Sequence, residues 1–198
     1  MKGRRDTRLA VLLLTPAFAI LGMFGVGPLF YAIYLSLFRM LRGGAKSFVG
    51  ASNYSEALGN EDFWNSFFVT AYYALGTVPV TLVLSFFIAA GLYRIGRFRG
   101  TLRTLFFLPY VTSVVASAMI WRVLLDPTSG VANQLIGITG LPAQKWLLEP
   151  RGVLHIVTGG AVDMGVGPSL ALCCVIAFDI WISSGFMVVV LLAGLSAV

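Results

Sequence analysis

The chain has 198 residues, of which 58% are hydrophobic and 11% are charged, and its formal net charge is +6. Apolar side chains in this proportion exceed what a soluble core of ordinary size can bury, so the composition excludes a soluble domain and indicates an integral membrane protein. The positive charge does not indicate a nucleic-acid partner, because the cations lie in short runs beside apolar segments and not in a basic domain.

The chain begins with a basic segment, residues 1–8, which leads into a long apolar segment, residues 9–38. This arrangement is typical of a signal peptide, and Ala17, Phe18 and Ala19 would be its cleavage site. The apolar run continues for about another twenty residues, which favours a retained membrane span over a removed signal. We therefore predict a cytoplasmic segment at 1–8 and a first span at 9–38.

Residues 39–66 are polar and carry charges of both signs, which is typical of an outer loop. Within this loop, residues 52–64 could form a short helix at the membrane interface, with Asn53 as its N-cap. The chain is apolar again over residues 67–93, where Pro79 has a central position, and we predict the second span there.

Residues 94–103 form a loop that contains four arginines and no acid. Because positively charged loops stay on the cytoplasmic side, this loop is predicted to be cytoplasmic and the following span, residues 104–125, to cross outward. Residues 126–168 are rich in glycine and proline and are predicted to be an outer loop. The fourth span is predicted at 169–198, so that Val198 returns to the cytoplasmic side.

Two features of the third span set its expected shape. Pro109 is expected to break the helix near its inner end. Arg122 precedes Asp126 by four residues, a spacing at which the two side chains can form an ion pair near the outer end. The predicted fold class is all-α: a polytopic transmembrane helix bundle of about four spans in one domain, residues 1–198.

The sequence contains none of the motifs that mark nucleotide binding or hydrolysis. It lacks G-x-x-x-x-G-K-[ST], so any ATP that the protein uses must be hydrolysed elsewhere. Its single histidine, His155, has no histidine or cysteine near it in sequence, and G-x-S-x-G and H-E-x-x-H are absent. Cys173 and Cys174 are adjacent, which excludes an ordinary disulfide between them and offers no metal-ligand spacing. We expect no catalytic residue, no metal site and no cofactor.

Asp179 is an acid inside a predicted span. Because an ionisable side chain is costly to place in the membrane, Asp179 is a candidate functional residue. At helical spacing Asp179, Ile182, Ser183 and Phe186 share one face, which would align a carboxylate, a hydroxyl and an aromatic ring. Carbohydrates offer hydroxyls to acceptors and apolar C–H faces to rings, so this stripe is a candidate sugar-binding surface. Alternatively, Asp179 pairs with another helix or reaches the outer water.

Six short segments of the sequence carry a resemblance to a known family. In chain order they are Phe48-Val49-Gly50 with Asn53-Tyr54; Phe63-Trp64-Asn65; Arg103-Thr104-Leu105-Phe106-Phe107-Leu108-Pro109-Tyr110; Trp121-Arg122 with Asp126-Pro127, Gly130 and Asn133; Trp181 with Gly185-Phe186; and Leu191-Leu192-Ala193-Gly194-Leu195. Together they resemble the permease subunits of bacterial binding-protein-dependent ABC importers, in the carbohydrate-uptake branch that includes the maltose permease. The resemblance covers nearly the whole chain and implies the first part of a six-span permease.

The resemblance implies that the protein is one of two permease halves that enclose a sugar path in the bacterial inner membrane, with its amino terminus in the cytoplasm. The implied partners are a second permease subunit, a dimer of cytoplasmic ATPase subunits, an extracytoplasmic sugar-binding protein, the carbohydrate and membrane lipid, and no nucleic acid. The protein would thus be a transporter subunit and not an enzyme.

The resemblance also implies a set of substrate-binding residues. Tyr110 matches the position at which the third core helix of the family presents a tyrosine to sugar. Asp179, Ile182, Ser183 and Phe186 match the part of the next core helix that lines the same cavity. These five residues form the predicted sugar site.

Two departures from the family bear on this interpretation. Residues 152–168 are longer than the connection that many members have. The cytoplasmic coupling helix of the family, with its Glu-Ala-Ala signature, would begin after Val198, so the chain is expected to be the amino-terminal portion of a permease. The alternatives are a small membrane scaffold or assembly protein without a transport path, and a membrane enzyme.

Overall fold

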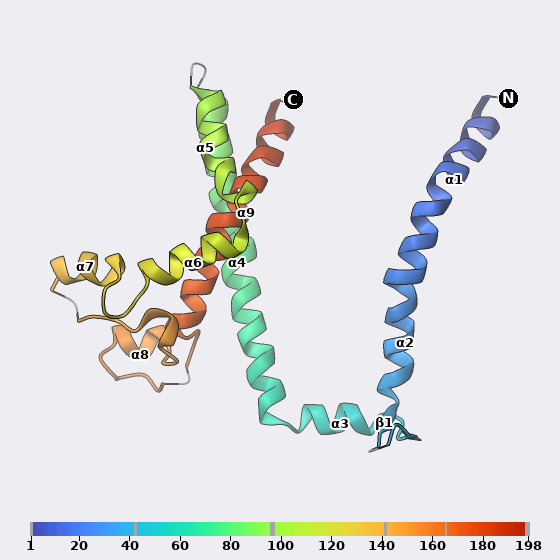
Figure 1. Cartoon of the computed structure of the whole chain (residues 1–198), viewed down its shortest axis with the longest axis horizontal. Helices are drawn as coiled ribbons and strands as arrows, with labels where there is room; N and C mark the ends of the chain where they lie inside the picture. Colours follow the sequence, from blue (N-terminus) through green and yellow to red (C-terminus); the bar gives the residue numbers. More distant parts are fainter. Residues whose placement is uncertain (1, 42, 96–97, 141, 165, 197–198) are drawn as a thin grey trace. The chain divides into compact units, whose positions relative to one another are not determined.

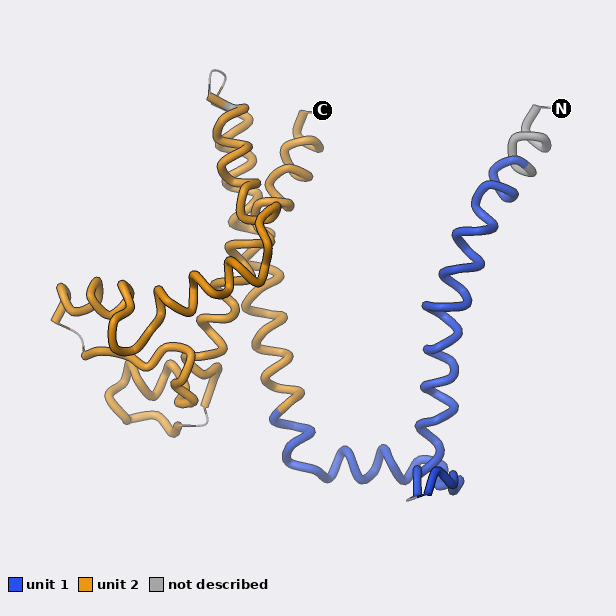
Figure 2. Tube along the Cα trace, in the orientation of Figure 1, with its two compact units in different colours: residues 1–65 blue, residues 66–198 orange. Residues whose placement is uncertain are grey.

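The chain divides into two compact units, residues 1–65 and 66–198 (Figure 2). Within the first unit, the apolar helical stretch Leu9–Ser36 has none of its described residues buried. Some predicted segments extend outside the described residues. These parts are residue 1 and residues 96–97 of the predicted cytoplasmic segments, and residues 197–198 of the predicted fourth span. The computed structural model describes residues 2–41, 43–95, 98–140, 142–164 and 166–196, without the side chains of residues 2–8 and 99.

The first unit begins with one long helical rod that carries the first predicted span (Figure 1). Its elements are α1 (Lys2–Leu21), a π-helical turn (Gly22–Val26) and α2 (Gly27–Ser36). The wide turn adjoins Pro28, which has no N–H to donate to the carbonyl four residues earlier, and the Gly27 N–H donates to Gly22 O, five residues back. The apolar part of the rod, Leu9–Ser36, has 28 residues, or about 42 Å of helix at 1.5 Å per residue, more than a bilayer core requires.

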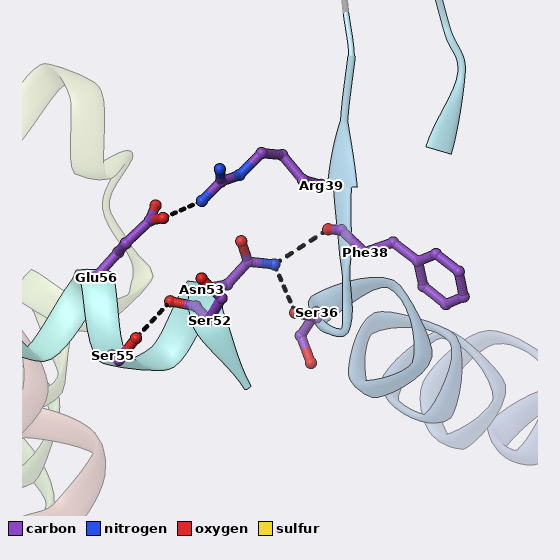
Figure 3. Close-up of polar contacts among 7 residues, drawn as sticks. All are labelled: Ser36, Phe38, Arg39, Ser52, Asn53, Ser55 and Glu56. Carbon is purple, nitrogen blue, oxygen red and sulfur yellow. Dashed lines mark hydrogen bonds and ion pairs between the residues drawn. The ribbon is translucent and has the colours of Figure 1, made fainter. Parts of the chain in front are cut away.

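A small hairpin and a short helix follow the rod. The hairpin pairs β1 (Phe38–Met40) with β2 (Lys46–Phe48) in an antiparallel register that places Phe38 opposite Phe48. The rings of these two residues meet edge to face, with centroids 5.3 Å apart. An ion pair between Arg39 and Glu56 connects the hairpin to α3 (Ser52–Leu58) (Figure 3).

Asn53 does not cap α3, so that prediction from the sequence is wrong. The N-cap is Ala51, which places Asn53 already within the first turn of the helix. Its Nδ2 donates instead to Ser36 O at 2.7 Å and to Phe38 O at 3.1 Å (Figure 3). The last carbonyls of a helix have no partner inside the helix, and Asn53 satisfies the one at the end of α2.

The second unit is built on three helices that cross in one bundle (Figure 1). They are α4 (Glu61–Arg94), which begins in the first unit, α5 (Arg99–Val111) and α9 (Leu170–Ser196). The second and fourth predicted spans, residues 67–93 and 169–198, lie along α4 and α9. A core joins the helices at one end of the bundle and contains the buried residues Ala89, Leu92, Val188 and Leu192, with Leu102 of α5 packed against them.

The third predicted span, residues 104–125, is not one straight helix. It consists of α5 and α6 (Val114–Leu124), which meet at 92° across Thr112 and Ser113. Both residues have extended ψ angles, and the Thr112 hydroxyl bonds Pro109 O at 2.7 Å and Ser117 Oγ at 3.1 Å. The break therefore lies where hydroxyl side chains compete for backbone groups, one turn beyond the proline that the sequence indicated.

The segment predicted to be an outer loop, residues 126–168, has structure of its own. Asp126 does not pair with Arg122: among the described residues the ion pairs are Arg39–Glu56 and Arg151–Glu149. The Asp126 carboxylate instead accepts hydrogen bonds from the Thr128 hydroxyl and from the N–H groups of Thr128 and Ser129. These bonds lower the pKa of Asp126, and the bond from the Thr128 hydroxyl has the largest effect. The helical elements of the segment are α7 (Val131–Ile138), a 3₁₀ turn (Trp146–Leu148) and α8 (Val153–Val157).

Two polar side chains, those of Asn133 and Glu149, make several hydrogen bonds each in this segment. The Asn133 amide donates to Pro127 O at 2.8 Å and to Gln144 O at 3.0 Å, and its oxygen accepts from Trp146 Nε1 at 2.8 Å. The buried Glu149 accepts two bonds of 2.7 Å from the guanidinium of Arg151, which holds the pKa of this carboxyl at about 2. The predicted loop is thus an ordered connection between α6 and α9.

The predicted fold class is confirmed. Within the described residues, three helices are long and apolar enough to cross a membrane, and the bent pair α5–α6 makes a fourth if it is counted as one span. The protein is an all-α membrane protein whose strands are confined, in the part of the chain that the structure describes, to the short hairpin β1–β2.

Candidate functional site

Asp179 lies on α9 and is held by two hydroxyl groups. The Tyr73 hydroxyl, on α4, donates to Asp179 Oδ2 at 2.7 Å. The Ser183 hydroxyl, one turn further along α9, donates to Asp179 Oδ1 at 3.0 Å. All three side chains are half-buried. The sequence left open whether Asp179 pairs with another helix, and it does, through a tyrosine.

Both donors to Asp179 are neutral, so the charge of the carboxylate is not neutralised by a neighbouring cation in the described part of the chain. An ionised carboxylate has about four acceptor sites on its two oxygens. One site on each oxygen is used here, which leaves acceptor capacity on both. Among the described residues there is no group of three or more His, Cys, Asp or Glu side chains that could hold a metal ion.

Tyr110 of α5 and Phe186 of α9 form an aromatic pair. Their rings are stacked, with centroids 5.0 Å apart and an interplanar angle of 25°. Both side chains are about half exposed, at 46% and 45%. The stack exists because α5 and α9 approach closely at Gly185, where an added Cβ would lie 2.4 Å from Phe106 O. A flat apolar surface of this kind suits the C–H face of a sugar ring.

The two groups lie on one side of α9. Asp179 and Phe186 are seven residues apart, or two turns, which is about 10.5 Å of rise at 1.5 Å per residue. Ile182 lies between them and is buried, at 9% exposure, so it contributes to packing and offers little surface to a ligand. Of the five predicted residues, the structure therefore joins Tyr110 with Phe186 and Asp179 with Ser183.

Sequence reasoning missed Tyr73, which is 106 residues from its partner Asp179. A signal for it exists, because Tyr73, Thr77, Thr81 and Ser85 recur every four residues and therefore share one face of α4. Thr77 and Thr81 are each only 6% exposed, and their hydroxyls have no hydrogen-bond partner within the described part of the chain. The hydroxyl of Ser85 bonds a backbone carbonyl of α9 at 3.3 Å. Polar residues spaced in this way inside an apolar span indicate the face that packs on a neighbouring helix.

An aromatic cluster fixes α6 against α9. The ring of Trp121 meets Phe178 edge to face at 5.6 Å and lies 5.9 Å from Trp181. These ring contacts join α6 to α9 beyond the 92° bend.

Comparisons with known proteins give the family. A probable ABC transporter permease protein of Pyrococcus horikoshii is 31% identical over 202 residues, which cover 100% of this chain and 63% of that protein. The trehalose/maltose transport system permease protein MalF of Thermococcus litoralis is 28% identical over 195 residues, which cover 98% of this chain and 60% of that protein. No protein-family model matches the chain.

A solved structure has the same fold. It is the crystal structure of a bacterial alginate ABC transporter in complex with an alginate pentasaccharide-bound periplasmic protein, and it matches with a TM-score of 0.65 at 19% identity. The match covers 98% of this chain and 59% of the other chain. The chain thus spans about three fifths of the length of the proteins it matches.

Proposed function

The chain belongs to the membrane-spanning permease subunits of ABC transporters, and on this premise we propose that it forms half of the translocation path of an ATP-driven carbohydrate importer. Two findings support the proposal. One relative is named as a trehalose/maltose transport system permease. The similarity extends over all or nearly all of this chain, including the helices that carry the candidate site.

The observation that carries the proposal is the pairing of an aromatic stack with a partly free carboxylate on one side of α9. The Tyr110–Phe186 stack offers a surface for C–H groups, and Asp179 offers acceptors for hydroxyl groups. A carbohydrate presents both kinds of group. Since the charge of Asp179 has no cationic partner among the described residues, an anionic ligand would be repelled, and we propose a neutral sugar as the substrate class.

The proposed partners follow from what the sequence lacks and from the family. The chain has no phosphate-binding loop, so ATP would be hydrolysed by a pair of cytoplasmic ATPase subunits. A second permease subunit would complete the path, and an extracytoplasmic sugar-binding protein would deliver the substrate, as the periplasmic protein in the alginate transporter complex suggests. The proposed location is the bacterial inner membrane, with the basic amino terminus in the cytoplasm.

The test is uptake by the complete transporter that carries Asp179→Leu. Loss of a hydrogen bond to a charged acceptor costs about 1.5–3 kcal/mol, so uptake at low sugar concentration should fall about tenfold to a hundredfold. Membrane insertion should be unchanged or improved, because a charge at the centre of a span costs about 2.5–3.5 kcal/mol to insert.

Ser184→Ala is the matched control on the same helix, since the Ser184 hydroxyl bonds the Trp181 carbonyl one turn away, at 3.1 Å, and no other group among the described residues. The control should transport as the wild type does. Wild-type uptake by the Asp179→Leu transporter at normal expression would assign Asp179 a purely structural role and would remove the main support for the proposed site.

A further inference from the structure

The contact between Tyr73 and Asp179 joins two helices through a neutral donor. An ionised carboxylate can only accept hydrogen bonds, so the Tyr73 hydroxyl is the donor in the 2.7 Å bond to Oδ2. A lysine or arginine at this place would cancel the charge of Asp179, whereas a phenol leaves it in place. Tyr73 therefore fixes the carboxylate without neutralising it.

One donor to the Asp179 carboxylate lies on its own helix, α9, and the other lies on α4. Ser183 holds Oδ1 from α9 at 3.0 Å, and Tyr73 holds Oδ2 from α4. The terminal torsion of an aspartate side chain is broad, so a carboxylate with one donor can rotate, while a carboxylate with a donor on each oxygen is held in one plane. The remaining acceptor sites of the two oxygens then form a bidentate acceptor, which matches two hydroxyl groups on adjacent carbons.

Other contacts already hold α4 against α9, so this bond is not needed for that purpose. Ala89 and Val188 are fully buried in the shared core. Gly76 allows the side chain of Ile176 to approach so closely that an added Cβ would lie 2.9 Å from it. Ser85 adds a further interhelical hydrogen bond of 3.3 Å. Because single hydrogen bonds between membrane helices contribute little to stability, the Tyr73 hydroxyl is available for another role.

We propose that Tyr73 is a positioning residue of the sugar site: it holds the Asp179 carboxylate in the plane that accepts a vicinal diol of a neutral sugar. This inference rests on the proposed function and deepens it. The proposal makes α4 part of the sugar site through Tyr73, although the sequence did not connect this helix with the site. It also narrows the ligand to neutral sugars whose ring carries two free hydroxyls on adjacent carbons.

The experiment is Tyr73→Phe in the complete transporter, assayed with radiolabelled maltose, trehalose and further neutral sugars to identify one that the wild type takes up. We expect the KM for uptake to rise about tenfold while the maximal rate stays within about twofold, because the variant weakens binding and leaves the coupling to ATP untouched. Tyr72→Phe is the matched control: Tyr72 is the neighbouring tyrosine on the same helix and is 38% exposed. Its KM should equal that of the wild type.

A double variant separates positioning from direct contact or packing. If Tyr73 acts through Asp179, then Tyr73→Phe combined with Asp179→Leu, which removes every acceptor at position 179, should have the same KM as Asp179→Leu alone. Additive effects would overturn the proposal. Ser183→Ala removes the donor to the other oxygen without a change in α4, and it should raise the KM in the same way even if Tyr73→Phe fails to fold.

The remaining outcomes are distinct. A Tyr73→Phe transporter with a lowered melting temperature and an unchanged KM would show that the bond only joins helices, which refutes the positioning role and leaves the proposed function standing. A wild-type transporter that takes up none of the neutral sugars would refute the proposed function and the positioning role together.

Discussion

Gly185 is the place where α5 and α9 come closest, and Gly185→Ala is expected to force them apart. A Cβ at this position would lie 2.4 Å from Phe106 O and 3.3 Å from two carbon atoms of the α5 backbone. Since ordinary contact begins at 3.4 Å, the two helices would have to separate by about 1 Å. The obstructing atoms belong to a helix backbone, so no side-chain rotation can relieve the clash.

The magnitude follows from two opposing effects. Overpacking of this kind costs typically about 1–3 kcal/mol. Alanine has a higher helix propensity than glycine by up to about 1 kcal/mol, which offsets part of that cost. After the full offset, we expect a net loss of up to about 2 kcal/mol in the free energy of unfolding. Gly194→Ala, on the same helix with no atom within 4 Å of the added Cβ, should be neutral or stabilising.

The assay is the thermal unfolding midpoint of the permease in lipid nanodiscs, measured for both variants. The Gly185→Ala midpoint should fall below the wild-type value, and the Gly194→Ala midpoint should not. Sugar uptake should fall with Gly185→Ala alone, because separation of the helices pulls Tyr110 away from Phe186. Equal midpoints for the two variants would refute the close approach of α5 and α9, and with it the origin of the aromatic stack.

Two further predictions concern the predicted loops. A reporter protein fused after Arg99 should report a cytoplasmic location and one fused after Gln144 an extracytoplasmic location, because arginine-rich loops are retained inside; the reverse result would overturn the proposed orientation. The pKa of Glu149 is lowered from 4.5 to about 2 by its arginine partner, so its stabilising effect is complete above about pH 4.5 and is lost as the pH falls toward 2. The amide of Ala171, which bonds Glu149 O, should therefore lose hydrogen-exchange protection over that range in the wild type, and a Glu149→Gln variant should show no such pH dependence.

Hydropathy along the sequence was enough to predict an all-α membrane protein, because membrane insertion depends on the summed hydropathy of neighbouring residues. The apolar stretches at 9–38 and 67–93 are long enough to span, and the arginines of residues 94–103 predict an orientation. Short segments such as that from Arg103 to Tyr110 predicted the family, which the relatives confirm. The period of an α-helix placed Asp179, Ser183 and Phe186 on one face before any contact was known.

The contacts that these residues make depend on how the helices pack. The break at Thr112 and Ser113 depends on hydroxyls that compete for backbone groups. A hydropathy profile does not show this break, because the residues on both sides of it are apolar. Asn53 satisfies the carbonyl at the end of α2 instead of capping its own helix, a choice between two backbone partners that only the folded chain makes. The bond from Tyr73 to Asp179 joins residues 106 positions apart. Such a contact exists only once small residues such as Gly76 and Gly185 have let the helices pack closely, since the reach of a side chain is short and the helix positions are set by packing.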